Sequence, residues 1–206
     1  MMLLKDEIIE RVNNCEGLSE IEILDDCVSA YDDIEGRELN FRFLENLNFD
    51  EIFHFGTFKL DKERFYELLK QLDPILFLMP RKIYFISNEE ELEKLEAKYE
   101  CQSMNIHKHL GINWYADTVI IINIYLIKKI MENKDFSECF SSVDTEYNFA
   151  VWTTLIHELR HMVCDSGLII SEEEIPLSDG EEDAVEENCN YVFDEVIAKN
   201  NFLIFN

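Results

Sequence analysis

The chain has 206 residues and a formal net charge of −26, with 47% hydrophobic and 12% aromatic residues. This apolar content is typical of a folded globular protein and excludes an intrinsically disordered one. So large a negative charge repels nucleic-acid phosphates and anionic lipid headgroups, so we expect neither a nucleic-acid nor a membrane partner.

The cysteines and the apolar runs indicate the compartment. Six cysteines are scattered along the chain without a C-x-x-C pair, unlike the disulfide framework of a secreted domain. The apolar run at Met1–Leu4 is too short for a signal peptide. The longest later run, residues 119–127, contains Asn123 and is too short to span a membrane. A cytoplasmic protein with reduced thiols is therefore expected.

Residues 1–79 are expected to form an acidic, largely helical N-terminal region packed on the core. Apolar residues at helical spacing predict a helix near residues 4–12. Asp61 is placed to cap a second helix, which Asp73–Pro74 must end. The stretch 21–47 mixes acidic and aliphatic residues and gives no clear assignment.

Residues 80–206 have a clearer pattern, which predicts the core of an α+β fold. A short buried strand is expected at 82–86, followed by a capping box at Ser87–Glu90 that opens a helix through Tyr99. A loop is expected at 101–116. Residues 118–126 are β-branched and apolar on both faces, and they predict the strongest strand. Whether this strand is central or at a sheet edge stays open.

The stretch His157-Glu158-Leu159-Arg160-His161 contains the motif H-E-x-x-H. It lies in a helix predicted to open at Asp144 or Thr145 and to end near Cys164. Residues four apart share a helix face, so the imidazoles of His157 and His161 can reach one metal ion. The Glu158 carboxylate beside them can take a proton from metal-bound water. The alternative is a surface helix whose His and Glu side chains are merely solvated.

A catalytic zinc site needs a third protein ligand and one open position for water. The metzincin extension requires a glycine and a histidine where this chain has Cys164 and Gly167, so that arrangement is excluded. Asp165 lies one turn beyond His161, but three ligands on one straight helix give poor tetrahedral geometry. We therefore look to a later helix for the third ligand.

That later helix is predicted to start at a capping box, Ser178–Glu181, and to run to about Lys199. Glu182 and Glu186 are four residues apart and project near its apolar stripe. A carboxylate facing a core is costly unless it is paired or bound to metal. Carboxylates at the start of a helix also favour its dipole, which is the structural alternative for Glu182.

An H-E-x-x-H helix followed by a Glu-bearing helix resembles the gluzincin type of zinc metallopeptidase. The second helix is similar to that of the intracellular ImmA/IrrE-like group at Glu186, Cys189, Asn190, Val192, Phe193, Val196 and Ile197. The resemblance covers residues 118–197. It implies a zincin-like fold, in which a small sheet packs on the H-E-x-x-H helix and on the second helix.

The resemblance also implies a site and an activity. Zn²⁺ would be held by His157, His161 and Glu186, with Asn190 beside Glu186; a thermolysin-like pattern would use Glu182 instead. A zinc-bound water activated by Glu158 would hydrolyse peptide bonds of a protein or peptide substrate. The alternative function is a zincin-like metal-binding regulatory or interaction domain without proteolytic turnover. A third possibility is an acidic interaction protein with a chance motif.

Two further parts of such a site are expected. A donor to the carbonyl oxygen of the substrate should exist, and the candidates are Tyr147, Tyr191 and His109. Zincin-like proteins bind the substrate as an added strand at a sheet edge, for which the strand at 118–126 is the candidate.

Overall fold

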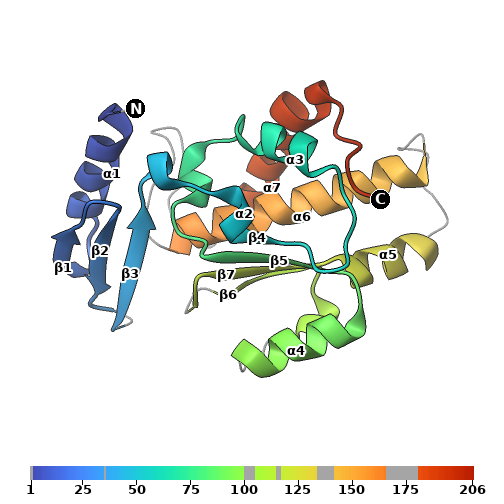
Figure 1. The fold of residues 1–206 in the computed structure, drawn as a ribbon, viewed down its shortest axis with the longest axis horizontal. Helices are drawn as coiled ribbons and strands as arrows, with labels where there is room; N and C mark the ends of the chain where they lie inside the picture. Colours follow the sequence, from blue (N-terminus) through green and yellow to red (C-terminus); the bar gives the residue numbers. More distant parts are fainter. Residues whose placement is uncertain (1, 35, 100–104, 115–116, 134–141, 166–180) are drawn as a thin grey trace.

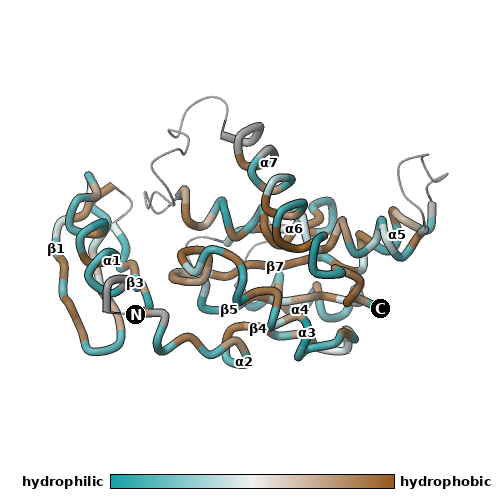
Figure 2. Tube along the Cα trace, turned by 90° about the horizontal axis from the view of Figure 1, so that it is seen from above, coloured by the Kyte–Doolittle hydropathy of each residue, from teal (hydrophilic) through white to brown (hydrophobic). Residues whose placement is uncertain are grey.

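The computed structural model describes residues 2–34, 36–99, 105–114, 117–133, 142–165 and 181–206, which form a mixed α+β structure (Figure 1). The N-terminal helix and three strands lie to one side of a larger unit that contains a second sheet, as Figures 1 and 2 both show. No helix in these described ranges is long and apolar enough to cross a membrane.

The N-terminal part is an antiparallel sheet covered by a helix. Its elements are α1 (Met2–Asn14), β1 (Leu18–Ile23), β2 (Cys27–Asp32) and β3 (Arg37–Arg42), with strand order β1-β2-β3. Val28 and Phe41 are opposite one another in neighbouring strands and fully buried, as is Val12 of α1. The helix near residues 4–12 is confirmed.

The expectation of a largely helical N-terminal region is wrong for residues 18–42. The buried side chains of β2 and β3 alternate with polar ones, which is the period of a half-buried strand. This period was obscured because acidic residues are as frequent as aliphatic ones in this stretch.

The second sheet contains the strands next to the H-E-x-x-H helix. Its strands are β4 (Phe53–His54), β5 (Lys82–Ile86), β6 (Gly111–Trp114) and β7 (Val119–Asn123), in the order β4-β5-β7-β6. The pairs β4–β5 and β5–β7 are parallel, whereas β6 runs antiparallel to β7. The predicted strand at 82–86 is confirmed.

The strand predicted at 118–126 is central, buried and shorter than expected. It spans Val119–Asn123, and its tube is hydrophobic along its length (Figure 2). The Asn123 side chain accepts a hydrogen bond from the Leu126 backbone N–H at 3.0 Å, so it caps the following helix, α5 (Ile124–Asn133). The edge strands of the sheet are β4 and β6, and β6 lies within the segment expected to be a loop.

Helices cover both faces of this sheet. The helices not yet given are α2 (Phe49–Ile52), α3 (Lys62–Leu69), α4 (Glu89–Tyr99), α6 (Val143–Asp165) and α7 (Glu181–Val192), which continues as a π-helical turn over Phe193–Ile197. Ile120 and Ile122 of β7 pack in one cluster with α6, and Ile121 packs in another with Leu92 of α4. Helix α6 therefore lies against one face of the sheet and α4 against the other (Figure 1).

Two local predictions about helix ends are confirmed. The Asp61 carboxylate accepts a hydrogen bond from the Arg64 backbone N–H at 3.1 Å and caps α3. Helix α6 begins at Val143 and ends at Asp165, within two residues of the expected bounds. Helix α7 is described from Glu181 to Val192; residues 178–180 of the capping box predicted for it lie outside the described ranges.

The apolar C-terminal segment packs on α6. Ile204 and Phe205 are each 4% exposed. The buried Asn148 side chain accepts hydrogen bonds from both of their backbone N–H groups, at 2.7 and 2.8 Å. Its amide nitrogen donates to the backbone carbonyls of Asp144 and Phe205, at 2.9 and 3.1 Å. All four hydrogen-bonding positions of this side chain are therefore used, which fixes the tail beside the N-terminal part of α6.

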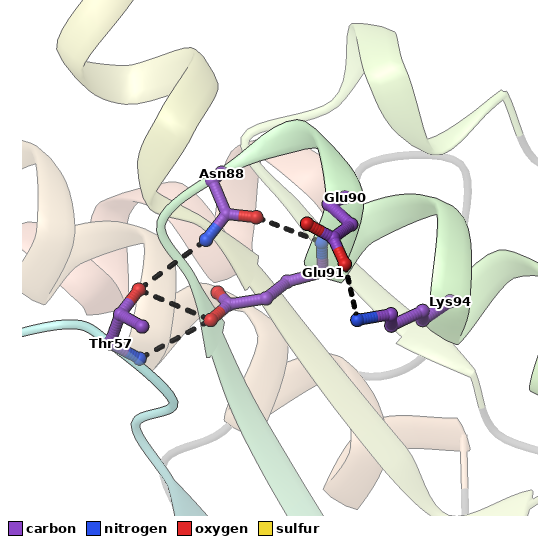
Figure 3. A network of polar contacts seen from close by, with 5 residues as sticks. All are labelled: Thr57, Asn88, Glu90, Glu91 and Lys94. Carbon is purple, nitrogen blue, oxygen red and sulfur yellow. Dashed lines mark hydrogen bonds and ion pairs between the residues drawn. The ribbon is translucent and has the colours of Figure 1, made fainter.

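The cap of α4 is displaced by one residue from the predicted box (Figure 3). Asn88, and not Ser87, accepts the hydrogen bond of the first turn, from the Glu91 backbone N–H at 2.9 Å. The Glu91 carboxylate turns back and accepts from the backbone N–H groups of Ser87, at 3.1 Å, and Thr57, at 3.3 Å. Glu90 points away and pairs with Lys94 at 2.6 Å. Glu91 therefore joins the start of α4 to the loop after β4.

We expect Glu91→Gln to destabilise the fold in a pH-dependent way. Partial burial alone would raise the pKa of the Glu91 carboxyl, but hydrogen bonds from Ser87 and Thr57 outweigh it and hold the pKa below its ordinary value. The charged carboxylate therefore stabilises the fold above the ordinary glutamate pKa, and this contribution is lost as the pH falls through the lowered pKa. Urea unfolding at pH 7 should show a loss of about 1 kcal/mol that shrinks toward pH 3.

Glu90→Gln is the matched control, because the Glu90 carboxylate is exposed and pairs with the side chain of Lys94. It should leave the unfolding free energy nearly unchanged at both pH values. An equal loss in the two variants would show that the Glu91 network does not stabilise α4.

Candidate functional site

Helix α6 brings the two histidines of the motif into contact. The Nε2 atoms of His157 and His161 are 2.9 Å apart, and their ring planes lie at 73°. Two nitrogens bound at about 2.05 Å to a tetrahedral zinc ion are about 3.3 Å apart, so the spacing needs to open by only about 0.4 Å. Two nitrogen lone pairs this close repel unless a proton or a cation lies between them. The 2.9 Å spacing is that of an N–H···N hydrogen bond between the two rings, and it is also close to the spacing of two ligands of one metal ion.

The Glu158 side chain is held between α6 and the edge strand β6. It is 8% exposed. A Cβ atom added at Gly111 would lie 2.6 Å from both Cγ and Oε1 of Glu158, and 2.7 Å from Cγ2 of Thr154. Any larger residue at position 111 would displace the carboxylate or the strand. Gly111 therefore allows α6 to approach β6 closely enough to fix the direction of Glu158.

A pocket of about 410 Å³ opens beside these residues. It has three walls, which come from α6, from α7 and from the segment that leads into β6. The lining residues are Phe149, Thr153, Thr154, His157 and Glu158 of α6, Glu186, Cys189 and Asn190 of α7, and His109, Leu110 and Gly111. His161 is joined to this pocket through its contact with His157. The fold thus brings together His157, Glu158, Glu186 and Asn190, which are up to 33 residues apart in the sequence.

Glu186 lines the same pocket as His157, but its carboxylate does not reach the two histidines. Its side chain is exposed at the pocket. Over the described ranges, no three His, Cys, Asp or Glu side chains are grouped closely enough to hold a metal ion. Glu186 would therefore have to turn inward to reach an ion held by the histidines. The side chains of Glu182 and Asp165 lie outside the part of the chain that the structure describes.

Charges from both helices converge on Cys189, which is 3% exposed. Burial raises the pKa of its thiol to about 12; the guanidinium of Arg160 lowers that pKa, and the carboxylates of Glu158 and Glu186 raise it. The thiol is therefore protonated at neutral pH and is neither a nucleophile nor a ready metal ligand. The guanidinium of the buried Arg160 is thus near Cys189 of α7, where its positive charge offsets the carboxylates of Glu158 and Glu186.

The three candidates for a donor to the substrate differ in position. Tyr147 is 7% exposed, and burial raises the pKa of its hydroxyl. Tyr191 is 66% exposed. Neither tyrosine lines the pocket, whereas His109 does.

Gly111 is the residue of this site that the sequence analysis missed. A glycine inside a strand is a signal of close backbone approach. The signal was not used because residues 111–114 were expected to belong to a loop.

Comparisons with protein-family models, curated proteins and solved structures find no match to this chain.

Proposed function

We propose that this protein is a zinc-dependent metallopeptidase of the zincin type. The observation that carries the proposal is the 2.9 Å distance between the Nε2 atoms of His157 and His161, where His157 lines the same pocket as the buried Glu158. The remaining support is the arrangement of helix α6 against the edge strand of a small sheet.

The donor set fits zinc, which binds imidazole nitrogens and a carboxylate oxygen in tetrahedral sites. His157 and His161 would supply the nitrogens. Glu186 is the third ligand that we propose, because it lines the pocket and a carboxylate side chain can turn inward from a helix surface. A bound zinc ion would supply a Lewis acid and a water molecule of lowered pKa.

Glu158 acts as the general base and then as the general acid. Its carboxylate is held against Gly111 and Thr154. It therefore loses little conformational entropy when it takes a proton from the attacking water. The water oxygen bonds to the carbonyl carbon and the C–N bond breaks. Glu158 then gives the proton to the leaving amine.

The substrate binds as an extended strand along β6. This strand pairs with β7 on one side and is the last of its sheet, so its other edge offers backbone groups to a peptide. The pocket below it has a polar end at His157 and Glu158, and an apolar surface at Phe149 and Leu110. We therefore propose a peptide with an apolar side chain next to the scissile bond.

The test is cleavage of a defined peptide mixture by the zinc-loaded protein, followed by mass spectrometry. We expect new peptide termini next to apolar residues, which disappear after 1,10-phenanthroline treatment and return with added zinc. Zinc binding without any cleavage, for peptides and folded proteins alike, would favour the regulatory or interaction domain instead.

A further inference from the structure

We propose that His109 donates a hydrogen bond to the carbonyl oxygen of the scissile peptide bond as that oxygen becomes negatively charged. This assignment rests on the proposed peptidase function. It names a catalytic residue outside the H-E-x-x-H helix and the Glu-bearing helix.

The first argument is the supply of donors in the pocket. Attack by water places negative charge on the carbonyl oxygen, and a side-chain donor fixed nearby lowers that barrier. The hydroxyls of Thr153 and Thr154 donate to backbone carbonyls of α6, at 2.9 Å to Phe149 and 2.7 Å to Ala150. Their single protons are therefore used within the helix.

Apart from His157, which is a proposed ligand of the metal ion, two side chains on the pocket walls carry N–H donors, Asn190 and His109. Asn190 follows Glu186 by one helical turn, so its amide lies beside that carboxylate and on the same wall. His109 lies on a different wall, next to the edge strand along which we place the peptide. His109 therefore lies closer in the chain to the proposed peptide-binding strand than Asn190 does.

The second argument is that the segment carrying His109 is fixed at both ends. Asn123 is 1% exposed, although it ends an otherwise apolar strand. Its side-chain nitrogen donates to the Ile106 carbonyl at 3.1 Å, and its backbone N–H donates to the Leu110 carbonyl at 2.7 Å. The short turn between these two carbonyls contains His109. A donor carried by a fixed segment loses little freedom when the substrate binds, which is what a preorganised site requires.

The chemistry leaves the proton balance of the reaction unchanged. His109 keeps its N–H proton and only strengthens a hydrogen bond as the carbonyl oxygen gains charge. The proton taken from water still passes through Glu158 to the leaving amine.

The experiment measures the affinity of zinc-loaded protein for two inhibitors. Both are built on the same Leu-containing dipeptide. One is a phosphonamidate, whose tetrahedral oxygens imitate the charged carbonyl oxygen; the other is a thiol, which binds zinc but has no oxygen at that position. We expect His109→Ala to weaken binding of the phosphonamidate by about 100-fold or more, and binding of the thiol by less than about 3-fold. His109→Gln keeps a donor and should recover part of the loss.

His107→Ala is the matched control. His107 lies in the same turn, is exposed, does not line the pocket and has its Nε2 atom 3.4 Å from the Glu96 carboxylate. It should leave both affinities unchanged.

Three outcomes would overturn the assignment. An equal loss of affinity for both inhibitors in His109→Ala would mean that His109 only shapes the pocket. If His109→Ala kept its affinity for both inhibitors and Asn190→Ala lost affinity for the phosphonamidate alone, the donor would be Asn190. Wild-type protein that takes up zinc but binds neither inhibitor would contradict the peptidase function itself, and not only the role of His109.

Discussion

Replacing Glu158 with glutamine is expected to lower kcat/KM for peptide cleavage by about 10² to 10⁴-fold while zinc still binds. Glutamine keeps the size of the side chain, so it fits the space between Gly111 and Thr154. It cannot accept a proton from water, so the loss should appear in kcat and leave KM nearly unchanged. The assay is cleavage of the best peptide found with wild-type protein, with zinc content measured on the same samples.

Glu195→Gln is the control for this substitution. Glu195 is exposed, lies after α7 and forms an ion pair with Lys199. It should retain wild-type activity. If Glu158→Gln cleaved the peptide as fast as wild type, Glu158 would not be the base, and the activity would have to arise elsewhere.

Replacing His157 or His161 with alanine is expected to weaken zinc binding by more than about 100-fold. Each variant leaves one imidazole on α6 and removes the pair whose Nε2 atoms are 2.9 Å apart. One imidazole and one distant carboxylate do not form a site selective for zinc. Isothermal titration of chelator-stripped protein gives the affinity, and thermal unfolding shows whether the variant is folded.

The fold itself should survive these two substitutions. Both rings are partly exposed, whereas the neighbouring residues Leu155, Ile156 and Leu159 form the buried face of α6. His107→Ala again serves as the control, because His107 lies outside the pocket. A folded His157→Ala protein that bound zinc with wild-type affinity would contradict the site.

Elements with a strong local signal were predictable from the sequence. The strand at 82–86 is a continuous apolar run, and the cap Asp61 lies immediately before a helical pattern. The two histidines on one face of α6 follow from the helical repeat alone. In each case neighbouring residues determine the structure.

The edge strand β6 depends on contacts that are distant in sequence, so it was not predicted. It has four residues, begins with glycine and is defined by its pairing with β7, in which Gly111 lies opposite Ile122. The end of β7 at Asn123 has a similar origin, because the Asn123 side chain caps α5 and also binds the Ile106 carbonyl. Neither contact is visible in the local apolar pattern.

The third ligand could not be assigned from the sequence for a geometric reason. Glu182 and Glu186 are one helical turn apart, so helical periodicity places both on one face of α7. The structure adds that Glu186 lines the pocket with His157 and Glu158. The Glu186 side chain is exposed, so its inward turn toward the metal ion is proposed and not observed.

The most direct test of the proposed site is the X-ray absorption spectrum of the zinc-loaded protein at the zinc edge. We expect one zinc ion with two imidazole nitrogens and oxygen ligands, all at about 2.0 to 2.2 Å. The oxygen signal should change in Glu186→Ala, since that variant loses the proposed carboxylate ligand. A sulfur ligand at about 2.3 Å, or a zinc ion without imidazole ligands, would contradict the site formed by His157, His161 and Glu186.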